Sequence, residues 1–384
     1  MKFLSLVALL TVSAVPAFAH TYDKGTAVGG VSISELNQTE ATRRLTRELA
    51  PRLESKLALV VGNKKVYRRR SDLGFSLDVG KMLAQAKQQQ VVPIAFRVDA
   101  SVASGALKRL TPDLTTEVRD AVPIYVKDEV QIRPSIVGKR LDASTSAARI
   151  KILAEKEPTR TRFDLAETAT QPKVSSDDLK GINSVIGSYT TRFNPGKIGR
   201  TENIRVAIRS IDGKVIPNGA TFSLNNAVGE RTKARGYKDA IIFVDGKEEE
   251  GLGGGVSQVT GTLFNAALEA GLPIVTYRTH SRPVVYISLG RDATVAWGNF
   301  DNKWKNDTGA PIYISYQIKG RNRLKATLFG KDLGRTTKIR VTSKRNGARD
   351  IRANLYRVIY KNGEVQTNEK VGSSHYKWKA DDED

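Results

Sequence analysis

The sequence contains no cysteine and only three histidines. The absence of cysteine excludes disulfides, thiolate metal sites and cysteine nucleophiles together. With only His20, His280 and His375 present, a histidine-rich metal cluster is not expected either. We therefore expect neither a metal nor a cofactor, and an apolar core must supply the stability of the fold.

Acidic residues are also scarce, because 62 lysines and arginines stand against 40 acidic residues and leave a net charge of +22. A charge of this size attracts polyanions over long distances. A solvated surface that keeps the protein soluble explains the same charge equally well, since basic residues such as Arg43, Arg44, Arg68, Arg69 and Arg70 are widely spread.

Long apolar runs are missing after the first residues, which themselves have the pattern of a signal peptide, residues 1–19. Lys2 precedes an apolar stretch that ends at Val15, and Ala17-Phe18-Ala19 is a small-residue cleavage site. An uncleaved segment of this length would instead be a short anchor. We expect an exported protein of the periplasm or cell envelope, with no membrane span in the mature chain and no nucleic-acid partner.

A helix, a hairpin, a short strand and a second helix follow one another twice. In the first copy helical patterns cover 37–53 and 79–88, and in the second they cover 99–110 and 143–154. Hairpins are expected at 57–69 and 122–133. We infer two similar α+β modules, residues 25–90 and 91–168.

The element Gly74, Leu77-Asp78 returns as Gly138, Leu141-Asp142. Both aspartates come directly before a helix, so N-capping explains them better than a pair of catalytic carboxylates does. This arrangement resembles the peptidoglycan-binding module that is often found in tandem ahead of VanW domains, and the resemblance implies a wall-binding role. A polar stretch with Pro158 and Pro172 follows, and we place an extended linker at residues 169–187.

Three consecutive glycines, Gly253, Gly254 and Gly255, run directly into a helical pattern that starts near Ser257 and stops at Gly271. Ser257 has two interpretations. It is an N-cap, or it is a nucleophile beside unpaired amides and a helix dipole. The motif is not the nucleophile elbow G-x-S-x-G, because Val259 replaces the last glycine.

The glycine stretch belongs to a series of motifs between residues 188 and 330 that together resemble a VanW domain. They are Thr190-Thr191-Arg192-Phe193-Asn194, Pro217 to Ser223, Val228 to Thr232, Arg235-Gly236-Tyr237, Gly253-Gly254-Gly255, Gln258-Val259, Thr262-Leu263, Asn265 to Leu268, His280 to Val284, Gly290 to Val295 and Lys305-Asn306.

The resemblance implies an activity like that of L,D-transpeptidases, with a cysteine nucleophile at the position of Ser257. His280 would be the base, and Asp292, which is close to it in sequence, the group that orients the base. The three glycines, Gln258, Arg231 and Arg282 would bind substrate, the arginines by pairing with a stem-peptide carboxylate.

Each of these residues also has a structural explanation. His280 follows an apolar run and could be a hydrogen-bonded residue at a strand end, and Asp292 could satisfy amides in a turn. Arg231 and Arg282 could form surface ion pairs. A serine hydroxyl stays protonated where a cysteine would form a thiolate, so it needs a base within hydrogen-bond reach. We expect the parent activity to be lost.

Residues 331–384 are predicted to form a β-hairpin extension with its turn at Asn362-Gly363, followed by the acidic tail Asp381 to Asp384. The predicted fold class is α+β, with two repeated modules, a mixed and β-rich VanW domain at 188–330, and this extension.

Three functions remain open for such a chain. The first is binding of peptidoglycan or an associated anionic polymer without catalysis. The second is acyl transfer or peptidase chemistry by Ser257 on stem peptides. The third is a structural role with a protein partner. The sequence predicts no oligomeric state and no link to glycopeptide resistance.

Overall fold

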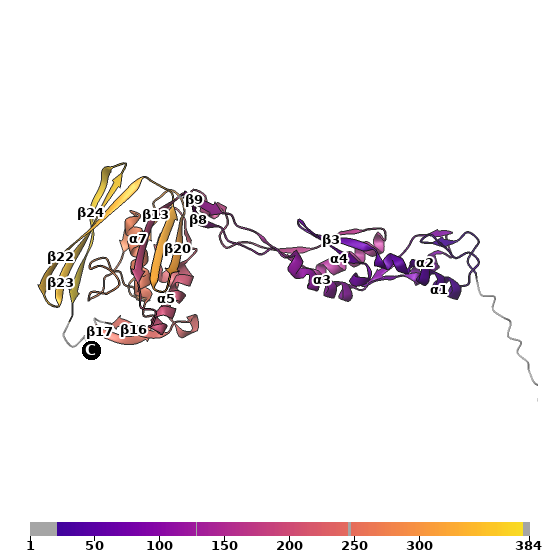
Figure 1. Cartoon of the computed structure of the whole chain (residues 1–384), viewed down its shortest axis with the longest axis horizontal. Helices are drawn as coiled ribbons and strands as arrows, with labels where there is room; N and C mark the ends of the chain where they lie inside the picture. Colours follow the sequence, from indigo (N-terminus) through magenta and orange to yellow (C-terminus); the bar gives the residue numbers. More distant parts are fainter. Residues whose placement is uncertain (1–20, 128, 245–246, 379–384) are drawn as a thin grey trace, which may run out of the picture. The chain divides into compact units, whose positions relative to one another are not determined.

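A computed structural model describes residues 21–127, 129–244 and 247–378 of the chain (Figure 1). The chain is an α+β protein. It divides into two compact units: one contains the residues up to Glu117 together with Val137–Thr170, and the other contains Val118–Ile136 together with the chain from Gln171 onward. The expected signal peptide and acidic tail lie outside the described residues, as do Asp128 and the turn expected at Asp245-Gly246.

The described residues of the first unit form four α-helices and ten strands. They are α1 (Gln38–Leu49), α2 (Val79–Gln85), α3 (Ala100–Leu114), α4 (Ala143–Lys156), β1 (Ala27–Val28), β2 (Val31–Ser32), β3 (Lys56–Val61), β4 (Lys64–Arg69), β5 (Phe75–Leu77), β6 (Val91–Val92), β7 (Phe96–Val98), β10 (Gly138–Leu141), β11 (Arg162–Asp164) and β12 (Glu167–Thr170).

Two cores hold this unit together. One packs α1 and α2 around Leu45 and Met82, and the other packs the hairpin β3–β4 with α3 and α4 around Leu59, Leu107 and Ile150. The hairpin of the first expected module therefore shares a core with the helices of the second. β11 joins this arrangement by pairing in parallel with β3.

The predicted helix starts are confirmed. Asn37 and Glu40 form a capping box at α1, and the side chains of Asp78 and Asp142 accept backbone N–H groups at the starts of α2 and α4. α1 ends earlier than the pattern predicts, because Pro51 cannot continue the helix and a 3₁₀ turn takes over. The residues expected to form a linker, 169–187, include the end of strand β12, which pairs with β10.

Within the part of the second unit that the structure describes there are three α-helices and fourteen strands. They are α5 (Ile198–Ile211), α6 (Leu224–Val228), α7 (Val256–Glu269), β8 (Val122–Val126), β9 (Glu129–Arg133), β13 (Ser184–Arg192), β14 (Val215–Ile216), β15 (Thr221–Ser223), β16 (Asp239–Val244), β17 (Lys247–Leu252), β18 (Ile274–Thr276), β19 (Lys303–Lys305), β20 (Ile312–Lys319), β21 (Arg323–Gly330), β22 (Arg335–Gly347), β23 (Asp350–Lys361) and β24 (Glu364–Lys377).

Helix α7 lies between two antiparallel sheets of the second unit (Figure 1). Val259, Leu263 and Ala266 pack toward the sheet β13-β21-β20-β14, and Phe264 and Leu268 pack toward the sheet β22-β23-β24. The approach to the first sheet is close, since a Cβ at Gly187 of β13 would lie 2.3 Å from the carbonyl oxygen of Ala266. Contact with a sheet on each side explains why nearly every residue of α7 is buried, including polar ones such as Gln258 and Asn265.

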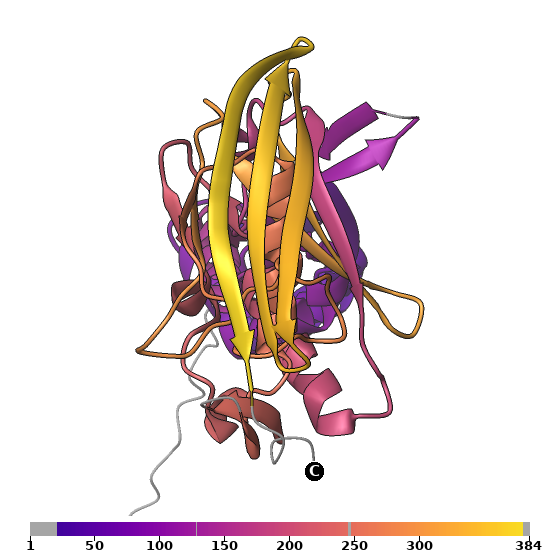
Figure 2. The ribbon, with the colours of Figure 1, turned by 90° about the vertical axis from the view of Figure 1, so that its left-hand side faces the viewer.

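The C-terminal extension is a three-stranded sheet, one strand more than the predicted hairpin. The expected turn at Asn362-Gly363 is present, with both residues at positive φ, and joins β23 to β24. β22 pairs along the other side of β23. Figure 2 shows this sheet as the front layer of the second unit.

Candidate functional site

The three glycines before α7 each have a geometric reason. Gly253 and Gly255 have φ values of +89° and +108°, which residues with a Cβ rarely adopt. A Cβ at Gly254 would lie 2.4 Å from the carbonyl oxygen of Ile241. The loop therefore turns sharply beneath the β16–β17 hairpin before the helix begins, and only glycine fits at these positions.

Ser257 is the second residue of α7, and the N-cap position belongs to Gly255. The capping interpretation of Ser257 is therefore wrong. Its half-buried hydroxyl lies 3.0 Å from the hydroxyl of Thr294, which comes from a separate loop. This contact ties the start of the helix to the segment that carries Asp292.

Backbone amides gather at the same place. In the described part of the chain, the N–H groups of Gly254, Gly255 and Ser257 donate to no other group. The first amides of a helix have no partner within the helix and carry the positive end of its dipole. The start of α7 can therefore stabilise a negative oxygen.

His280 and Asp292 form a buried pair. Arg278 and Thr294 form an antiparallel bridge. His280 follows Arg278 by two positions and Asp292 precedes Thr294 by two, so these two residues lie opposite each other. His280 Nδ1 lies 2.8 Å from Asp292 Oδ2, and the backbone N–H of His280 donates to the same oxygen at 2.7 Å. Their side chains are 5% and 2% exposed, so the carboxylate holds the imidazole with Nδ1 turned inward.

Tyrosines surround this carboxylate. The Tyr376 hydroxyl, from β24, donates to Asp292 Oδ1 and accepts the N–H of Gly290. Burial, and then the charge of Asp292, raises the pKa of Tyr277 to about 12. The same two causes raise the pKa values of Tyr286 and Tyr376 well above the ordinary range. These tyrosines therefore stay neutral at all physiological pH values.

The structure brings Ser257 close to the His280 and Asp292 segment without completing a triad. There is no hydrogen bond between the described side chains of Ser257 and His280, and the Ser257 hydroxyl is turned to Thr294. A serine nucleophile needs its base within hydrogen-bond reach. The observed arrangement therefore lacks the contact between nucleophile and base that serine catalysis requires.

A cavity of about 830 Å³ opens in the second unit, at the end of β13 and the start of α5. Gln258 and Arg282 line it, together with Tyr286 and Trp378, whereas Ser257, Arg231 and the three glycines do not. Three further cations, Arg192, Lys197 and Arg200, line it too; none of its described lining residues is acidic.

Arg200 is held at the cavity wall by two uncharged neighbours. Its Nη2 donates to Gln258 Oε1 at 2.7 Å, and its guanidinium lies 5.7 Å from the centre of the Tyr286 ring. Burial lowers its pKa, and no carboxylate among the described residues pairs with it. A desolvated cation without a counter-ion favours binding of an anion.

Gln258 fixes the direction of Arg200. Its side-chain amide is fully buried and donates to Thr191 Oγ1 and to the carbonyl oxygen of Arg192, both at 2.9 Å. The amide oxygen is thereby turned toward Arg200. Gln258 thus acts as a support for the arginine, in addition to its place in the cavity wall.

Arg231 lies elsewhere. Its side chain packs over Gly253, where a Cβ would lie 2.8 Å from Arg231 Cγ, and its Nη1 donates to the carbonyl oxygen of Gly229 at 3.0 Å. Arg231 therefore holds the glycine loop.

Sequence reasoning missed three residues of this region: Arg200, Tyr376 and Trp378. Arg200 sits on a helix where many arginines are exposed, and no local pattern distinguishes it. The other two come from the C-terminal sheet, and only its packing on α7 brings them to the site.

These observations define a class: a domain with a helix buried between two sheets, a glycine loop at its start, and a histidine–carboxylate pair beside it. Residues 199–329 match the sequence profile of the family described as VanW like protein, so this part of the chain is a VanW-like domain. The match covers the glycine loop, Ser257, His280 and Asp292, and ends before the C-terminal sheet.

The chain is similar to two curated relatives. The chain is 41% identical over 173 residues to YoaR of Bacillus subtilis (strain 168), which covers 45% of this chain and 57% of the relative. It is 32% identical over 121 residues to the vancomycin B-type resistance protein VanW of Enterococcus faecalis (strain ATCC 700802 / V583), which covers 30% of this chain and 42% of that protein. The chain thus spans about half the length of the curated relatives that it matches. No solved structure matches.

Two further properties concern the described residues. None of its helices is long and apolar enough to cross a membrane. No group of three or more histidine and acidic side chains in the described ranges is placed to hold a metal ion.

Proposed function

We propose that this is an exported envelope protein whose VanW-like domain binds peptidoglycan, with a carboxylate of the stem peptide held in the cavity beside Arg200. The observation that carries the proposal is the half-buried guanidinium of Arg200, which has an amide and an aromatic ring as neighbours and no acidic partner among the described residues.

The shape and lining of the cavity support a peptide ligand. About 830 Å³ is within the range of sites that enclose molecules of a few hundred daltons. Phe193, Tyr286 and Trp378 offer apolar surface, and the cations line the same cavity. A short peptide with a terminal carboxylate matches both features, because its backbone and side chains contact the rings while the carboxylate reaches Arg200.

The envelope location is supported by the signal-peptide pattern and by the excess of positive charge. The name of the Enterococcus relative connects that protein with vancomycin resistance, which favours an envelope role here as well.

A binding function without catalysis is favoured by the position of Ser257. Its hydroxyl pairs with Thr294 instead of His280, and its side chain does not line the cavity. A ligand carboxylate at Arg200 would therefore be bound without being presented to a reactive hydroxyl. On this proposal the domain is a degenerate member of its class, in which serine has replaced the nucleophilic thiol.

The test is binding of the mature protein to purified muropeptides with a free terminal carboxylate, measured by calorimetry beside the same muropeptides amidated at that carboxylate. Arg200→Gln is expected to weaken binding about tenfold, since a charge-assisted hydrogen bond contributes about 1.5–3 kcal/mol. Arg205→Gln, on an exposed face of the same helix, removes the same charge and should have no effect. Equal binding of both muropeptide forms would refute the proposal.

A second function is favoured by one specific observation, the buried His280 and Asp292 pair beside the unpaired amides at the start of α7. An imidazole oriented by a carboxylate and a set of oxyanion donors are two parts of acyl-transfer chemistry. The third part, a nucleophile in contact with the base, would require Ser257 to turn from Thr294 toward His280.

A further inference from the structure

The outer face of the C-terminal sheet is a second candidate binding surface. Along β23 buried and solvent-facing residues alternate strictly, and Arg352 and Tyr356 face outward. On the inner face Leu355 packs toward α7, and Ile351 and Ala353 pack beside Leu289. The neighbouring strands continue the outer face with Lys338, Arg340 and Lys344 from β22 and Lys370 from β24. Figure 2 looks onto this layer.

The outward cations are arranged in rows across the strands. Arg340, Tyr356 and Lys370 lie directly opposite one another, and so do Lys344, Arg352 and His375. We use the name basic face for the five exposed cations Lys338, Arg340, Lys344, Arg352 and Lys370.

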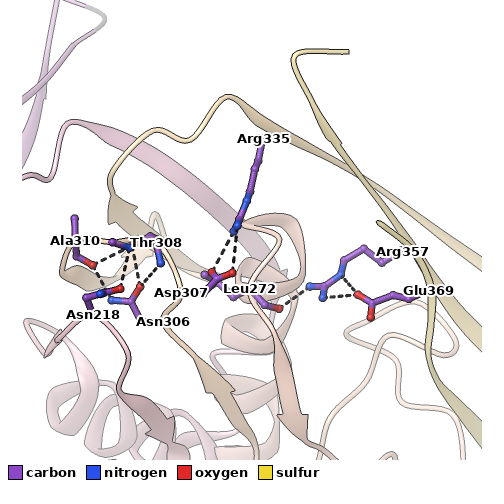
Figure 3. A network of polar contacts seen from close by, with 10 residues as sticks. Asn218, Leu272, Asn306, Asp307, Thr308, Ala310, Arg335, Arg357 and Glu369 are labelled. Atoms are coloured by element: carbon purple, nitrogen blue, oxygen red, sulfur yellow. Dashed lines mark hydrogen bonds and ion pairs between the residues drawn. The ribbon is translucent and has the colours of Figure 1, made fainter. Parts of the chain in front are cut away.

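The cations that anchor the inner side of the same sheet are neutralised. Arg335 pairs with Asp307 at 3.1 Å, and Arg357 pairs with Glu369 at 2.6 Å and donates to the carbonyl oxygen of Leu272 (Figure 3). By contrast, no carboxylate among the described residues pairs with any cation of the basic face. Asp350, at one end, is already held by His375 at 3.0 Å.

This arrangement does not help the sheet to fold. Lys344 stands directly opposite Arg352, and like charges in directly opposite positions destabilise a pair of strands. Five cations without counter-ions on one flat layer therefore call for an anion from outside the chain.

Two tyrosines on this face indicate which class of anion can bind there. Lys338 Nζ lies 5.2 Å from the centre of the Tyr360 ring, and the guanidinium of Arg340 lies 4.9 Å from that of Tyr356. These contacts hold the two charges in place. They also cover the ring faces on which the bases of a single-stranded nucleic acid would stack.

A lipid surface fits less well. Val365 is the one large apolar side chain of β22, β23 and β24 that is exposed within the described residues, and the face has no exposed leucine or tryptophan to enter a bilayer. Outward residues repeat about every 7 Å along a strand, so Lys338 and Arg340 present charges at that spacing on an open layer. An extended polymer with one charge per repeat can follow such a row.

We propose that the basic face binds an extended phosphodiester-linked polyol or sugar polymer of the cell wall. The inference does not depend on the cavity. Peptide carboxylates would bind beside Arg200, and the polymer would bind on the face of the C-terminal sheet that points away from α7. The two ligands would hold the domain where both polymers are present.

The test uses the full mature chain, with synthetic poly(glycerol phosphate) as the probe and the salt dependence of its binding as the readout. The variant carries Lys338→Gln, Arg340→Gln, Lys344→Gln and Arg352→Gln. Log K falls as log salt rises, and each phosphate contact makes this fall steeper by about 0.7. The variant loses four contacts, so its slope should be less steep by about 3 and its binding at least tenfold weaker. The matched control carries Arg43→Gln, Lys108→Gln, Arg109→Gln and Lys151→Gln, four exposed cations of the first unit.

Each result has a definite meaning. A loss in the sheet variant with full binding by the control supports the basic face, and retention of poly(glycerol phosphate) binding by Arg200→Gln separates it from the cavity. Equal losses in both quadruple variants would reduce the effect to net charge and overturn the proposal. Single-stranded DNA of equal charge, or anionic vesicles, bound as tightly as the polymer and lost in the same variant, would overturn the choice of partner. Circular dichroism of both variants checks that the fold is intact.

Discussion

Tyr376, on the last strand, donates its hydroxyl to one carboxylate oxygen of Asp292 while His280 contacts the other. Tyr376 lies outside the segment that matches the VanW family, residues 199–329. The C-terminal sheet therefore completes the hydrogen bonding of a residue pair that belongs to the family segment. The extension is thus part of the site.

Tyr376→Phe should disturb this pair without changing the packing of the ring. Asp292 loses a donor and the N–H of Gly290 loses an acceptor, both buried, so the free energy of unfolding in urea should fall by about 1–3 kcal/mol. The imidazole ¹⁵N spectrum of His280 should change as well, because its carboxylate partner is less firmly held. Tyr360→Phe, on the outer face of the same sheet, is the control. An unchanged His280 spectrum would refute the positioning role of Tyr376.

The glycine loop should tolerate no side chain. Gly255→Ala would place a Cβ at φ +108° and 3.1 Å from the side chain of Arg200, which should cost about 1–3 kcal/mol of stability and move the arginine. Gly347→Ala is the control, because it has open space and no positive φ, and it should stay within about 0.5 kcal/mol. Urea unfolding of both variants measures the difference. A Gly255→Ala protein as stable as wild type would show that the loop is free to rearrange.

Local chemistry accounts for what the sequence could predict. The caps at Asn37, Asp78 and Asp142 and the turn at Asn362-Gly363 depend on a few neighbouring residues, and all are present. Ser257 was harder, because a serine near a helix start caps it only if it occupies the N-cap position, and one residue of uncertainty moves it into the first turn.

The rest of the site depends on contacts between distant segments. Asp292 pairs with His280 because of the bridge between Arg278 and Thr294, and Tyr376 joins them across 84 positions of sequence. Arg200 differs from its exposed neighbours only through the packing of α5 beside Gln258. The pairing of Asp292 with His280 was expected from their closeness in sequence. No period or motif records the contacts of Tyr376 and Arg200, so these two roles could be recognised only in the folded chain.

Alkaline pH should destabilise the second unit through Tyr277. Its pKa is raised from 10.0 to about 12 by burial and by Asp292, so the folded state keeps a proton that the unfolded state loses. The stabilisation is complete below pH 10 and is lost as the pH rises from 10 to 12. Tyr277→Phe should make this loss shallower while changing stability at pH 7 by no more than about 1 kcal/mol, because its buried hydroxyl has no hydrogen-bond partner among the described residues.

Urea unfolding at pH 7, 9, 10 and 11 measures this effect, with Tyr67→Phe, an exposed tyrosine, as the control. The control should follow the wild-type profile. If the Tyr277→Phe profile also coincided with wild type above pH 10, the alkaline loss would have to come from other groups.

The identity of residue 257 should decide between binding and catalysis. We expect wild type and Ser257→Ala to leave muropeptides with tetrapeptide stems unchanged in mass spectrometry, because the Ser257 hydroxyl contacts Thr294 and not His280. Ser257→Cys should produce cross-linked or trimmed stems, since a thiol at a helix start beside an imidazole can ionise without direct contact with its base. His280→Gln in the cysteine background should abolish these products. New products from wild type that disappear in Ser257→Ala would instead establish a serine enzyme, in which Ser257 turns from Thr294 to His280 when substrate binds.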